Sequence, residues 1–288
     1  MPAYSYFPGC SLSGTSKEYG ASTVEVCRAL GIELTELEDW NCCGATSGHS
    51  ASREVADALG ARNVLLATDM GLDLVAPCAA CYNRTKRAAN VLAEGDAARK
   101  QRIAELLGRP VREPVRVLHL LEVFSHEEVA ERLGGRAMQP LPVSKVAAYY
   151  GCLLVRPPKE TGFDDPENPQ TMDRLLRLCG LETCDWYFKN ECCGASHSIP
   201  QSSVVLTLVD RIIRNARAAG AEWIVTACPL CQVNLDTRQQ VALGEEPLPV
   251  LYITQVLGLA LGLSPKSLGV PEQLMIPRVP AGAAGGGR

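Results

Sequence analysis

The sequence lacks the features that mark several protein classes. Its 28 Lys and Arg are balanced by 32 Asp and Glu, which gives a formal net charge of −4 and no basic footprint for nucleic acid. Its longest apolar run, residues 250–263, includes Thr254 and Gln255 and is too short to span a bilayer. The first ten residues, MPAYSYFPGC, contain neither the basic nor the apolar segment of a secretory signal. We therefore expect a cytoplasmic protein that binds no nucleic acid and does not span a membrane.

Two common redox motifs are also missing. No glycine-rich dinucleotide fingerprint is present, so a flavin or nicotinamide would have to bind to another subunit. No C-x-x-C-x-x-C run of the kind that binds cubane clusters is present either. The composition is that of a folded protein, with 47% hydrophobic and 21% charged residues over 288 positions. A chain of this size forms a buried core without needing cross-links.

Cysteine is the residue type present in excess. An odd count of 13 and the missing secretory signal argue against a structural disulfide framework. Ten of the cysteines form two sets of five with one shared pattern, C-x31-CCG-x33-C-x-x-C and then C-x39-CCG-x33-C-x-x-C. The first set is Cys10, Cys42, Cys43, Cys78 and Cys81, and the second set is Cys152, Cys192, Cys193, Cys228 and Cys231.

The sequence around the cysteines repeats as well, which indicates a tandem duplication. Residues 41–45 (NCCGA) match residues 191–195 (ECCGA), and a period of about 150 residues predicts two domains rather than a solenoid. We place these domains at 1–140 and 141–288 and expect the Gly/Ala-rich tail 280–288 to be disordered. The second copy has a longer insert, 155–169, which we predict to be an exposed loop.

The three remaining cysteines do not repeat between the halves. Aligning Gly31 with Gly180 places Cys27 opposite a leucine and Cys179 opposite a leucine, and Cys184 has no cysteine counterpart. Cysteine that exchanges with leucine behaves as a small buried hydrophobe. We therefore predict that these three residues are structural.

Each half is predicted to alternate strands and helices. Short apolar segments that end at or just before a cysteine predict strands at 4–10, 72–76, 146–152 and 223–227. Apolar residues three and four apart predict helices at 17–30, 52–70, 172–179 and 203–219. This alternation predicts two pseudo-symmetric tandem α/β domains with mainly parallel sheets. Ligand sites in such sheets lie beyond the carboxyl ends of the strands, which is where the cysteines fall.

Several kinds of site could use clustered cysteines. A thioredoxin-like dithiol would explain the Cys-x-x-Cys motif but would leave three matched cysteines in each half without a role. A structural zinc site takes four ligands, usually from two such motifs, whereas each half has one motif, one adjacent pair and one single cysteine. Neighbouring side chains such as those of Cys42 and Cys43 point apart, which suits a polynuclear iron–sulfur cluster better than a single ion. The pattern therefore predicts two iron–sulfur clusters, one in each half and close to the domain interface.

The two motifs resemble those of the B subunits of heterodisulfide reductases, a family with tandem CCG domains, and the resemblance extends from Tyr6 to about Leu263. It implies that each half binds a noncubane [4Fe-4S] cluster through all five cysteines of its set, so that Cys10, Cys42, Cys43, Cys78 and Cys81 would bind one cluster. Cys152, Cys192, Cys193, Cys228 and Cys231 would bind the other. It also implies that a substrate disulfide is split between the two clusters at the junction of the halves.

The resemblance further implies a multisubunit complex. Its electron donor would be a separate ferredoxin-like subunit with cubane [4Fe-4S] clusters, and its flavin would lie on another, flavin-containing subunit. Similar CCG domains occur in membrane-associated succinate, fumarate, lactate and glycolate oxidoreductases, so an electron-transfer subunit that interacts with quinone is the alternative. A zinc-bound scaffold protein is a third interpretation.

Polar residues close in sequence to the cysteines are candidates for tuning the clusters and delivering protons. His49 and His197 follow the two CCG turns, and we predict them as proton donors. Four basic residues are candidates for tuning the reduction potential, although each could equally be an ordinary surface residue: Arg84, Lys86, Arg156 and Lys159. His119 and His126 are predicted to be ordinary core or surface residues.

Overall fold

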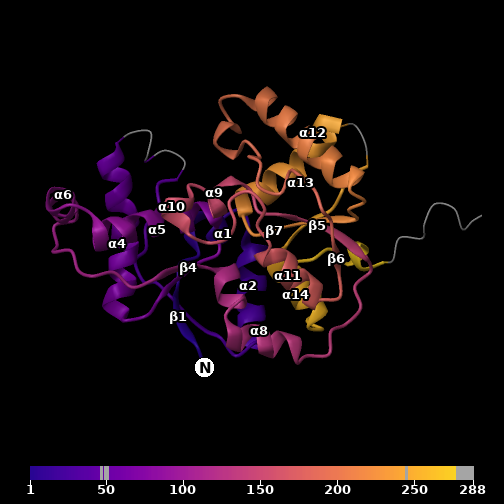
Figure 1. Ribbon diagram of the computed structural model, residues 1–288, viewed down its shortest axis with the longest axis horizontal. Helices are drawn as coiled ribbons and strands as arrows, with labels where there is room; N and C mark the ends of the chain where they lie inside the picture. Colours follow the sequence, from indigo (N-terminus) through magenta and orange to yellow (C-terminus); the bar gives the residue numbers. More distant parts are fainter. Residues whose placement is uncertain (46–47, 49–51, 244–245, 277–288) are drawn as a thin grey trace, which may run out of the picture.

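Two parallel sheets with the same strand order organise the chain (Figure 1). The computed structural model describes residues 1–45, 48, 52–243 and 246–276. The first sheet has the order β2-β1-β3-β4 and the second has the order β6-β5-β7-β8, and every pairing in both is parallel. The prediction of two pseudo-symmetric α/β units with parallel sheets is confirmed.

The first half carries the first sheet, whose strands alternate with helices. Its elements are β1 (Ala3–Tyr6), α1 (Gly9–Ser13), α2 (Lys17–Ala29), β2 (Glu33–Glu36), α4 (Arg53–Met70), β3 (Leu74–Ala76), α5 (Ala79–Glu94), α6 (Ala97–Leu107), β4 (Val117–His119), α7 (Leu120–Phe124) and α8 (Glu127–Gly134). Local signals fix several of the ends. The Ser52 hydroxyl accepts a hydrogen bond from Val55 N at the start of α4, and Gly71 ends the same helix at φ 68°.

The second half repeats this arrangement with additional short helices. Its elements are β5 (Lys145–Tyr149), α9 (Cys152–Val155), α10 (Pro158–Thr161), α11 (Thr171–Leu178), β6 (Glu182–Thr183), the 3₁₀ helix η1 (Ala195–His197), α12 (Ser202–Ala218), β7 (Trp223–Thr226), α13 (Pro229–Leu243), β8 (Val250–Tyr252), α14 (Ile253–Ala260) and the 3₁₀ helix η2 (Glu272–Met275). The last strand of each sheet runs directly into a short helix, and both of these junctions form capping boxes, at His119 with Glu122 and at Tyr252 with Gln255.

The order of the strands creates one topological switch point in each sheet. From β1 the chain moves outward to β2, and it then returns to add β3 on the other side of β1. The ends of β1 and β3 are therefore adjacent, and ligand sites of open α/β sheets form at such points. The strands are shorter than expected, because β1 ends at Tyr6 and α1 already includes Cys10.

The halves pack together through helices from both (Figure 1). Helix α2 of the first half contacts α14 of the second. At this contact the rings of Tyr19 and Tyr252 stack with their centroids 4.1 Å apart and an interplanar angle of 4°. The Ser22 and Thr254 hydroxyls share a buried hydrogen bond of 2.6 Å. Aromatic stacking and a satisfied buried hydrogen bond make this interface part of the core.

The insert of the second half corrects one prediction. The expected exposed loop at 155–169 contains α10, and its residues Val155 and Thr161 are almost completely buried. It packs on α5 of the first half, where Asn83 Nδ2 donates to Arg156 O and the Tyr82 hydroxyl donates to Thr161 O, both at 2.9 Å. The loop prediction was wrong for this part because its burial depends on distant residues of α5.

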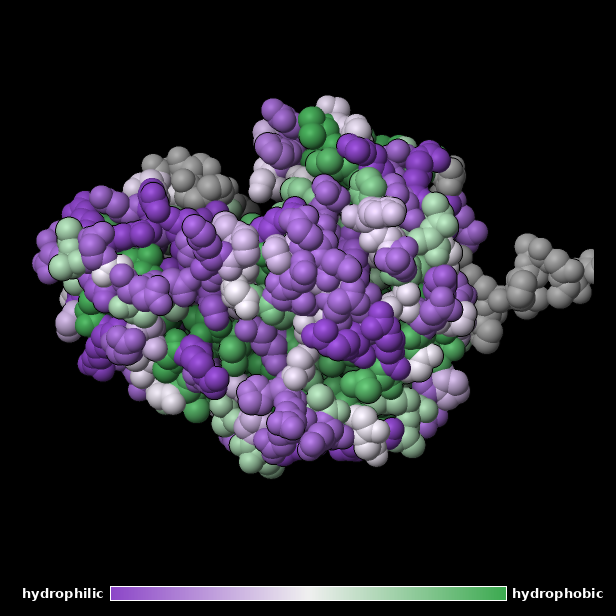
Figure 2. Space-filling view, in the orientation of Figure 1, coloured by the Kyte–Doolittle hydropathy of each residue, from purple (hydrophilic) through white to green (hydrophobic). Residues whose placement is uncertain are grey.

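No helix among the described residues is long and apolar enough to cross a membrane. The face drawn in Figure 2 is largely hydrophilic, with hydrophobic side chains recessed between polar ones. The predicted disordered tail, 280–288, lies outside the described residues.

Candidate iron–sulfur site

The switch point of the first sheet positions the first set of cysteines. Cys10 lies in α1 just after β1, Cys78 is the N-cap of α5 just after β3, and Cys81 lies in the first turn of α5. Cys42 and Cys43 lie in the loop that follows β2. Because helix N-termini carry partial positive charge, they favour thiolates over thiols. Three elements thus direct five sulfur atoms to one edge of the sheet.

Contacts between sulfur atoms connect the first set. The Sγ atoms of Cys10 and Cys42 lie 4.0 Å apart. Hydrogen bonds from the thiols of Cys42 and Cys81, together with the positive charge of Arg84, lower the pKa of Cys43 to about 3. Within this set the thiolate, which is the form that binds metal, is therefore favoured at Cys43, whereas the hydrogen bonds to Cys43 raise the pKa values of Cys42 and Cys81.

The second set lines a single cavity. This cavity has a volume of about 50 Å³, and all five cysteines of the second set contribute to its wall. The Sγ atoms of Cys193 and Cys231 lie 3.6 Å apart. A hydrogen bond from the Cys152 thiol lowers the pKa of Cys192 to about 6. The five cysteines are therefore close enough in space to act together.

The two sets meet where the halves join. Interaction with Cys228 raises the pKa of Cys78 well above its ordinary value, which indicates that the two thiols lie close to each other. The cavity of the second set is also lined by residues of the first half, namely Ala45, Ala79 and Ala80. The junction of the halves is thus a single sulfur-rich region.

The chemistry of the donors fits a polynuclear cluster. All 13 cysteines are free thiols, and even the close Cys193–Cys231 pair is far beyond the disulfide bond length of about 2.05 Å. Within the described residues, no group of three or more His, Cys, Asp or Glu is arranged to hold one metal ion. Five soft sulfur donors in each set, three of them buried, suit iron and inorganic sulfide. The assignment of individual ligands stays a prediction.

Matching glycines leave room for sulfur in both halves. Gly9 and Gly151 have φ values of +67° and +65°. A Cβ atom at Gly9 would lie 2.7 Å from Cys81 Sγ, and one at Gly151 would lie 2.9 Å from Cys231 Sγ. Both contacts are shorter than packed atoms tolerate. In each set, the backbone at the residue before the first cysteine lies very close to the sulfur atom of the last cysteine. A glycine is therefore required at this position.

Replacing Gly151 with Ala is expected to destabilise the protein and to disturb the second set. Gly162 provides the matched control, because it also has a positive φ but a Cβ atom there would meet no other atom within 4 Å. Gly162→Ala should cost about 1 kcal/mol from backbone strain alone, and Gly151→Ala should cost roughly 1–3 kcal/mol more because of the clash. Denaturant unfolding of both variants measures the difference, and equal losses would contradict the role of the Cys231 contact.

The three unmatched cysteines lie in the core, as the sequence predicts. Cys27, Cys179 and Cys184 are each at most 4% exposed. Burial raises the pKa of Cys27 and Cys179 to about 12 and that of Cys184 to about 11. They remain protonated and pack as apolar side chains.

The four basic candidates occupy different environments. Arg84 acts on Cys43 through its charge, and its Nε is buried and has no hydrogen-bond partner within the part of the chain that the structure describes. Lys86 instead donates to Val117 O at 3.0 Å, and Arg156 pairs with Glu167 in the insert. Lys159 is exposed on α10. Only Arg84 is placed by these contacts beside a cysteine of either set.

The histidines also differ in their exposure and in their position relative to the cysteines. His197 is exposed in η1, and its charge contributes to the lowered pKa of Cys192, of which the Cys152 hydrogen bond is the main cause. His49 lies outside the described residues. His126 is exposed, and His119 is fully buried, with Nε2 2.8 Å from Pro77 O. Burial lowers the pKa of His119 to about 4, so this ring is neutral and structural.

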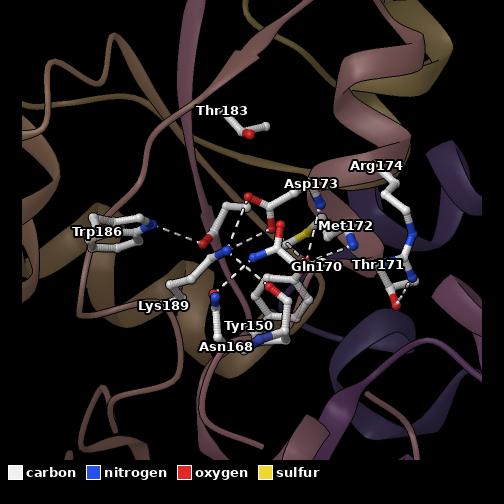
Figure 3. A network of polar contacts seen from close by, with 12 residues as sticks. Tyr150, Asn168, Gln170, Thr171, Met172, Asp173, Arg174, Thr183, Trp186 and Lys189 are labelled. Atoms are coloured by element: carbon white, nitrogen blue, oxygen red, sulfur yellow. Dashed lines mark hydrogen bonds and ion pairs between the residues drawn. The ribbon is translucent and has the colours of Figure 1, made fainter. Parts of the chain in front are cut away.

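A buried polar network supports the wall of the cavity (Figure 3). Tyr150, which lines the cavity, donates its hydroxyl to Asp173 Oδ2 at 2.7 Å. Lys189 Nζ donates to Asp173 Oδ1 at 3.1 Å and to Pro169 O at 2.9 Å. Burial, reinforced by the Asp173 carboxylate, raises the pKa of Tyr150. This network was not predicted from the sequence, because nothing in the local pattern distinguishes Lys189 from a surface lysine.

Asn234 was not predicted either. Its Nδ2 donates to Cys193 O at 3.0 Å and lies 3.8 Å from Cys193 Sγ. Its position three residues after Cys231, one helical turn along α13, is a signal that could have identified it.

Comparison with known proteins agrees with this site. The sequence profile of the cysteine-rich CCG domain matches residues 4–85 and 146–236, which include all ten cysteines of the two sets. The chain belongs to the CCG cysteine-rich domain family. The two matched segments correspond to the two halves that carry the sheets.

Curated relatives of this CCG-domain protein include subunits of two reductases. It is 33% identical to the membrane anchor subunit of 8-methylmenaquinol:fumarate reductase from Wolinella succinogenes, over 94% of this chain and 96% of the other. It is 30% identical to the B subunit of the ferredoxin/F420H2-dependent CoB-CoM heterodisulfide reductase from Methanosarcina acetivorans, over 94% and 93%. Lactate utilization protein A 2 from Bacillus cereus is 24% identical over 86% and 93%. The chain is therefore a CCG-domain redox subunit of the iron–sulfur type.

A solved structure shares the fold. A hypothetical protein from Helicobacter pylori superposes with a TM-score of 0.68 over 93% of this chain and 50% of its own, at 13% identity. At this identity the likeness concerns the fold alone.

Proposed function

We propose that this chain is the disulfide-cleaving subunit of a heterodisulfide reductase-like complex, with one noncubane [4Fe-4S] cluster on each set of five cysteines. The observation that carries the proposal is the cavity at the junction of the halves, which is lined by all five cysteines of the second set and by Ala45, Ala79 and Ala80 of the first half. Cys78 of the first set interacts with Cys228 of the cavity wall. A site built from two equivalent halves is suited to a substrate with two equivalent reacting atoms, which a disulfide has.

The reaction is RSSR′ + 2 e⁻ + 2 H⁺ → RSH + R′SH, in which the S–S bond breaks and each sulfur gains an electron and a proton. When bound, the two clusters supply the electrons one at a time, which iron–sulfur centres do well. His197 is the proposed proton donor on the side of the second set, because it is exposed to water and acts electrostatically on Cys192. His49 is the proposed donor on the side of the first set.

The walls of the cavity favour entry of a small apolar group. Besides the cysteines, Ala45, Ala79, Ala80, Leu153 and Leu230 line it. Its volume of about 50 Å³ is far below the roughly 300 Å³ that encloses a whole small ligand, and the cluster on the second set would occupy this space. We infer that the substrate stays outside and that only its sulfur atoms reach the cluster, from the side of the exposed Cys192.

We place this protein in the cytoplasm within a larger complex. The proposed electron donor is a ferredoxin-like subunit with cubane [4Fe-4S] clusters, and a flavin-containing subunit completes the complex. Two CCG domains at 1–140 and 141–288 are proposed as the architecture of this chain. Supporting this division, the last helix of the first half ends at Gly134 and the first strand of the second half begins at Lys145.

Anaerobic purification should yield about eight irons and about eight acid-labile sulfides per chain, as expected for two four-iron clusters. The protein should then oxidise a reduced ferredoxin or viologen dye when a low-molecular-weight disulfide is added. EPR spectra should change on addition of the product thiol, because a thiolate near the clusters alters their electronic environment. Zinc without labile sulfide would refute the proposal.

The alternative function is electron transfer to or from a quinone. It is favoured by the relative from Wolinella succinogenes, whose name includes both a menaquinol reaction and a membrane anchor. Turnover with a short-chain quinone analogue by an iron-replete complex that leaves disulfides intact would select this function. Disulfide cleavage with no quinone reaction would select the first.

A further inference from the structure

The two halves differ in charge at positions that correspond to each other. Arg84 lies three residues after Cys81 on α5, and Asn234 lies three residues after Cys231 on α13. Each interacts with the second cysteine of its adjacent pair: Arg84 acts on Cys43, whereas Asn234 lies 3.8 Å from the sulfur of the corresponding cysteine. The first site thus has a cation where the second has a neutral amide.

A second pair of corresponding residues differs in the same direction. Asn41 precedes the first cysteine pair and Glu191 precedes the second. The Glu191 charge disfavours the thiolate of Cys192, where it opposes the larger effect of the Cys152 hydrogen bond. Asn41 is neutral, and its side chain donates to Cys42 O and Leu59 O. The second site therefore has an additional anion, which the charge of the exposed His197 opposes at Cys192, and it lacks a cation at the position that corresponds to Arg84.

The environment of Arg84 suggests a negatively charged partner. Its Nε atom is buried and has no hydrogen-bond partner among the described residues. A buried donor of this kind costs free energy unless a group outside the protein chain accepts its hydrogen bond. Thiolate and sulfide of a cluster on the first set are acceptors of the required charge.

The second half also has an arginine near its cysteines, Arg238, but it contacts Asn234 and not a cysteine of the second set. Arg238 Nε donates to Asn234 Oδ1 at 3.1 Å, and its Nη2 donates to Ser198 O at 3.1 Å. The guanidinium is thereby directed to the amide oxygen, while the amide nitrogen faces Cys193. The neutral side chain of Asn234 thus lies between the Arg238 charge and Cys193.

We propose that Arg84 and Glu191 are positioning residues that give the two clusters different reduction potentials, with the first site the more readily reduced. This inference rests on the proposed function, because it requires the two clusters that the function assigns to the chain. Positive charge and N–H donors beside a cluster stabilise its reduced, more negative form, and a carboxylate has the opposite effect. A cluster on the first set would therefore accept an electron more readily than a cluster on the second set.

Potentiometric titration of the purified holoprotein, followed by absorption and EPR, tests the proposal. The unaltered protein should show two transitions. Arg84→Gln should lower the upper midpoint potential by at least about 59 mV, which is a tenfold change in the equilibrium constant for one electron, and should leave the lower midpoint potential unchanged. Arg84→Lys keeps the charge, so its upper midpoint potential should stay close to that of the unaltered protein.

Glu191→Gln is the reciprocal variant and should raise the lower midpoint potential alone. The expected change is about threefold in the reduction equilibrium constant, because the exposed charge of Glu191 is partly screened. Since Glu191 is exposed, this variant should fold even if Arg84→Gln does not. Arg102→Gln removes a cation from the exposed side of α6 and should move neither midpoint.

The outcomes separate this inference from the proposed function. Two clusters that titrate together in the unaltered protein, or variants at both positions that shift neither midpoint while iron content and disulfide cleavage are normal, would overturn the inference and leave the function standing. A protein without iron–sulfur clusters would refute both.

Discussion

Replacing Cys42 and Cys192 together with Ala is expected to abolish disulfide cleavage. Each removes an exposed sulfur donor from its set, and the cluster-bound state depends on these thiolates. We expect turnover to fall on the order of 100-fold or more, since the loss of groups that only support metal ligands already costs 10- to 100-fold. Iron and sulfide content should fall in parallel.

The matched control is Cys27→Ala, which removes a sulfur atom of the same size from the core of the first half. Cys27 is 1% exposed in α2 and belongs to neither set, so this variant should keep its iron and its turnover. An unchanged rate in the double variant would eliminate the proposed function. Loss of iron in Cys27→Ala as well would show that the assay reports general instability.

A further comparison separates cluster loss from proton delivery. His197→Gln should keep the full iron content, because His197 is not in either cysteine set. Its turnover should fall by about tenfold, less than the roughly 100-fold or more that is usual for a general acid, because water reaches the exposed imidazole and can replace it in part. If turnover and its dependence on pH are unchanged, His197 is not the donor.

The sequence predicts the sites well where the information is local. Apolar segments such as 223–227 predict buried strands that run into Cys-x-x-Cys, and β7 lies there. The edge strands β2 (ELTE) and β6 (ET) were missed because their short sequences have no apolar run. The type of residue and its immediate neighbours thus determine which cysteines lie at strand ends.

Features that depend on how the halves pack could not be predicted. Helix α2 docks on α14, which brings together residues more than 200 positions apart, and Cys78 interacts with Cys228 of the other half. The insert looked exposed because Pro, Asp and Glu are usually solvated, but Tyr82 and Asn83 of the first half bind its backbone. Composition describes a segment by itself and contains no information about its partner.

Replacing Lys189 with Met is expected to cost about 3–5 kcal/mol of folding free energy, the usual effect of removing one partner of a buried ion pair. Lys189 and Asp173 have side chains only 5% and 1% exposed. Without the ammonium, the Asp173 carboxylate remains buried with Tyr150 as its main remaining partner. Thermal or denaturant unfolding of the holoprotein and of the variant measures the loss.

Lys145→Met is the matched control, because Lys145 pairs with Glu182 at 3.0 Å on the surface. Surface pairs contribute little, so its stability should be almost unchanged. Asp173→Asn added to Lys189→Met should recover part of the loss, since it removes the unpaired charge while keeping an oxygen that can accept from Tyr150. A Lys189→Met variant as stable as Lys145→Met would show that the network does not support the fold. Because Tyr150 lines the cavity, the same substitution should also weaken disulfide turnover in the protein that remains folded, which connects the buried pair to the geometry of the site.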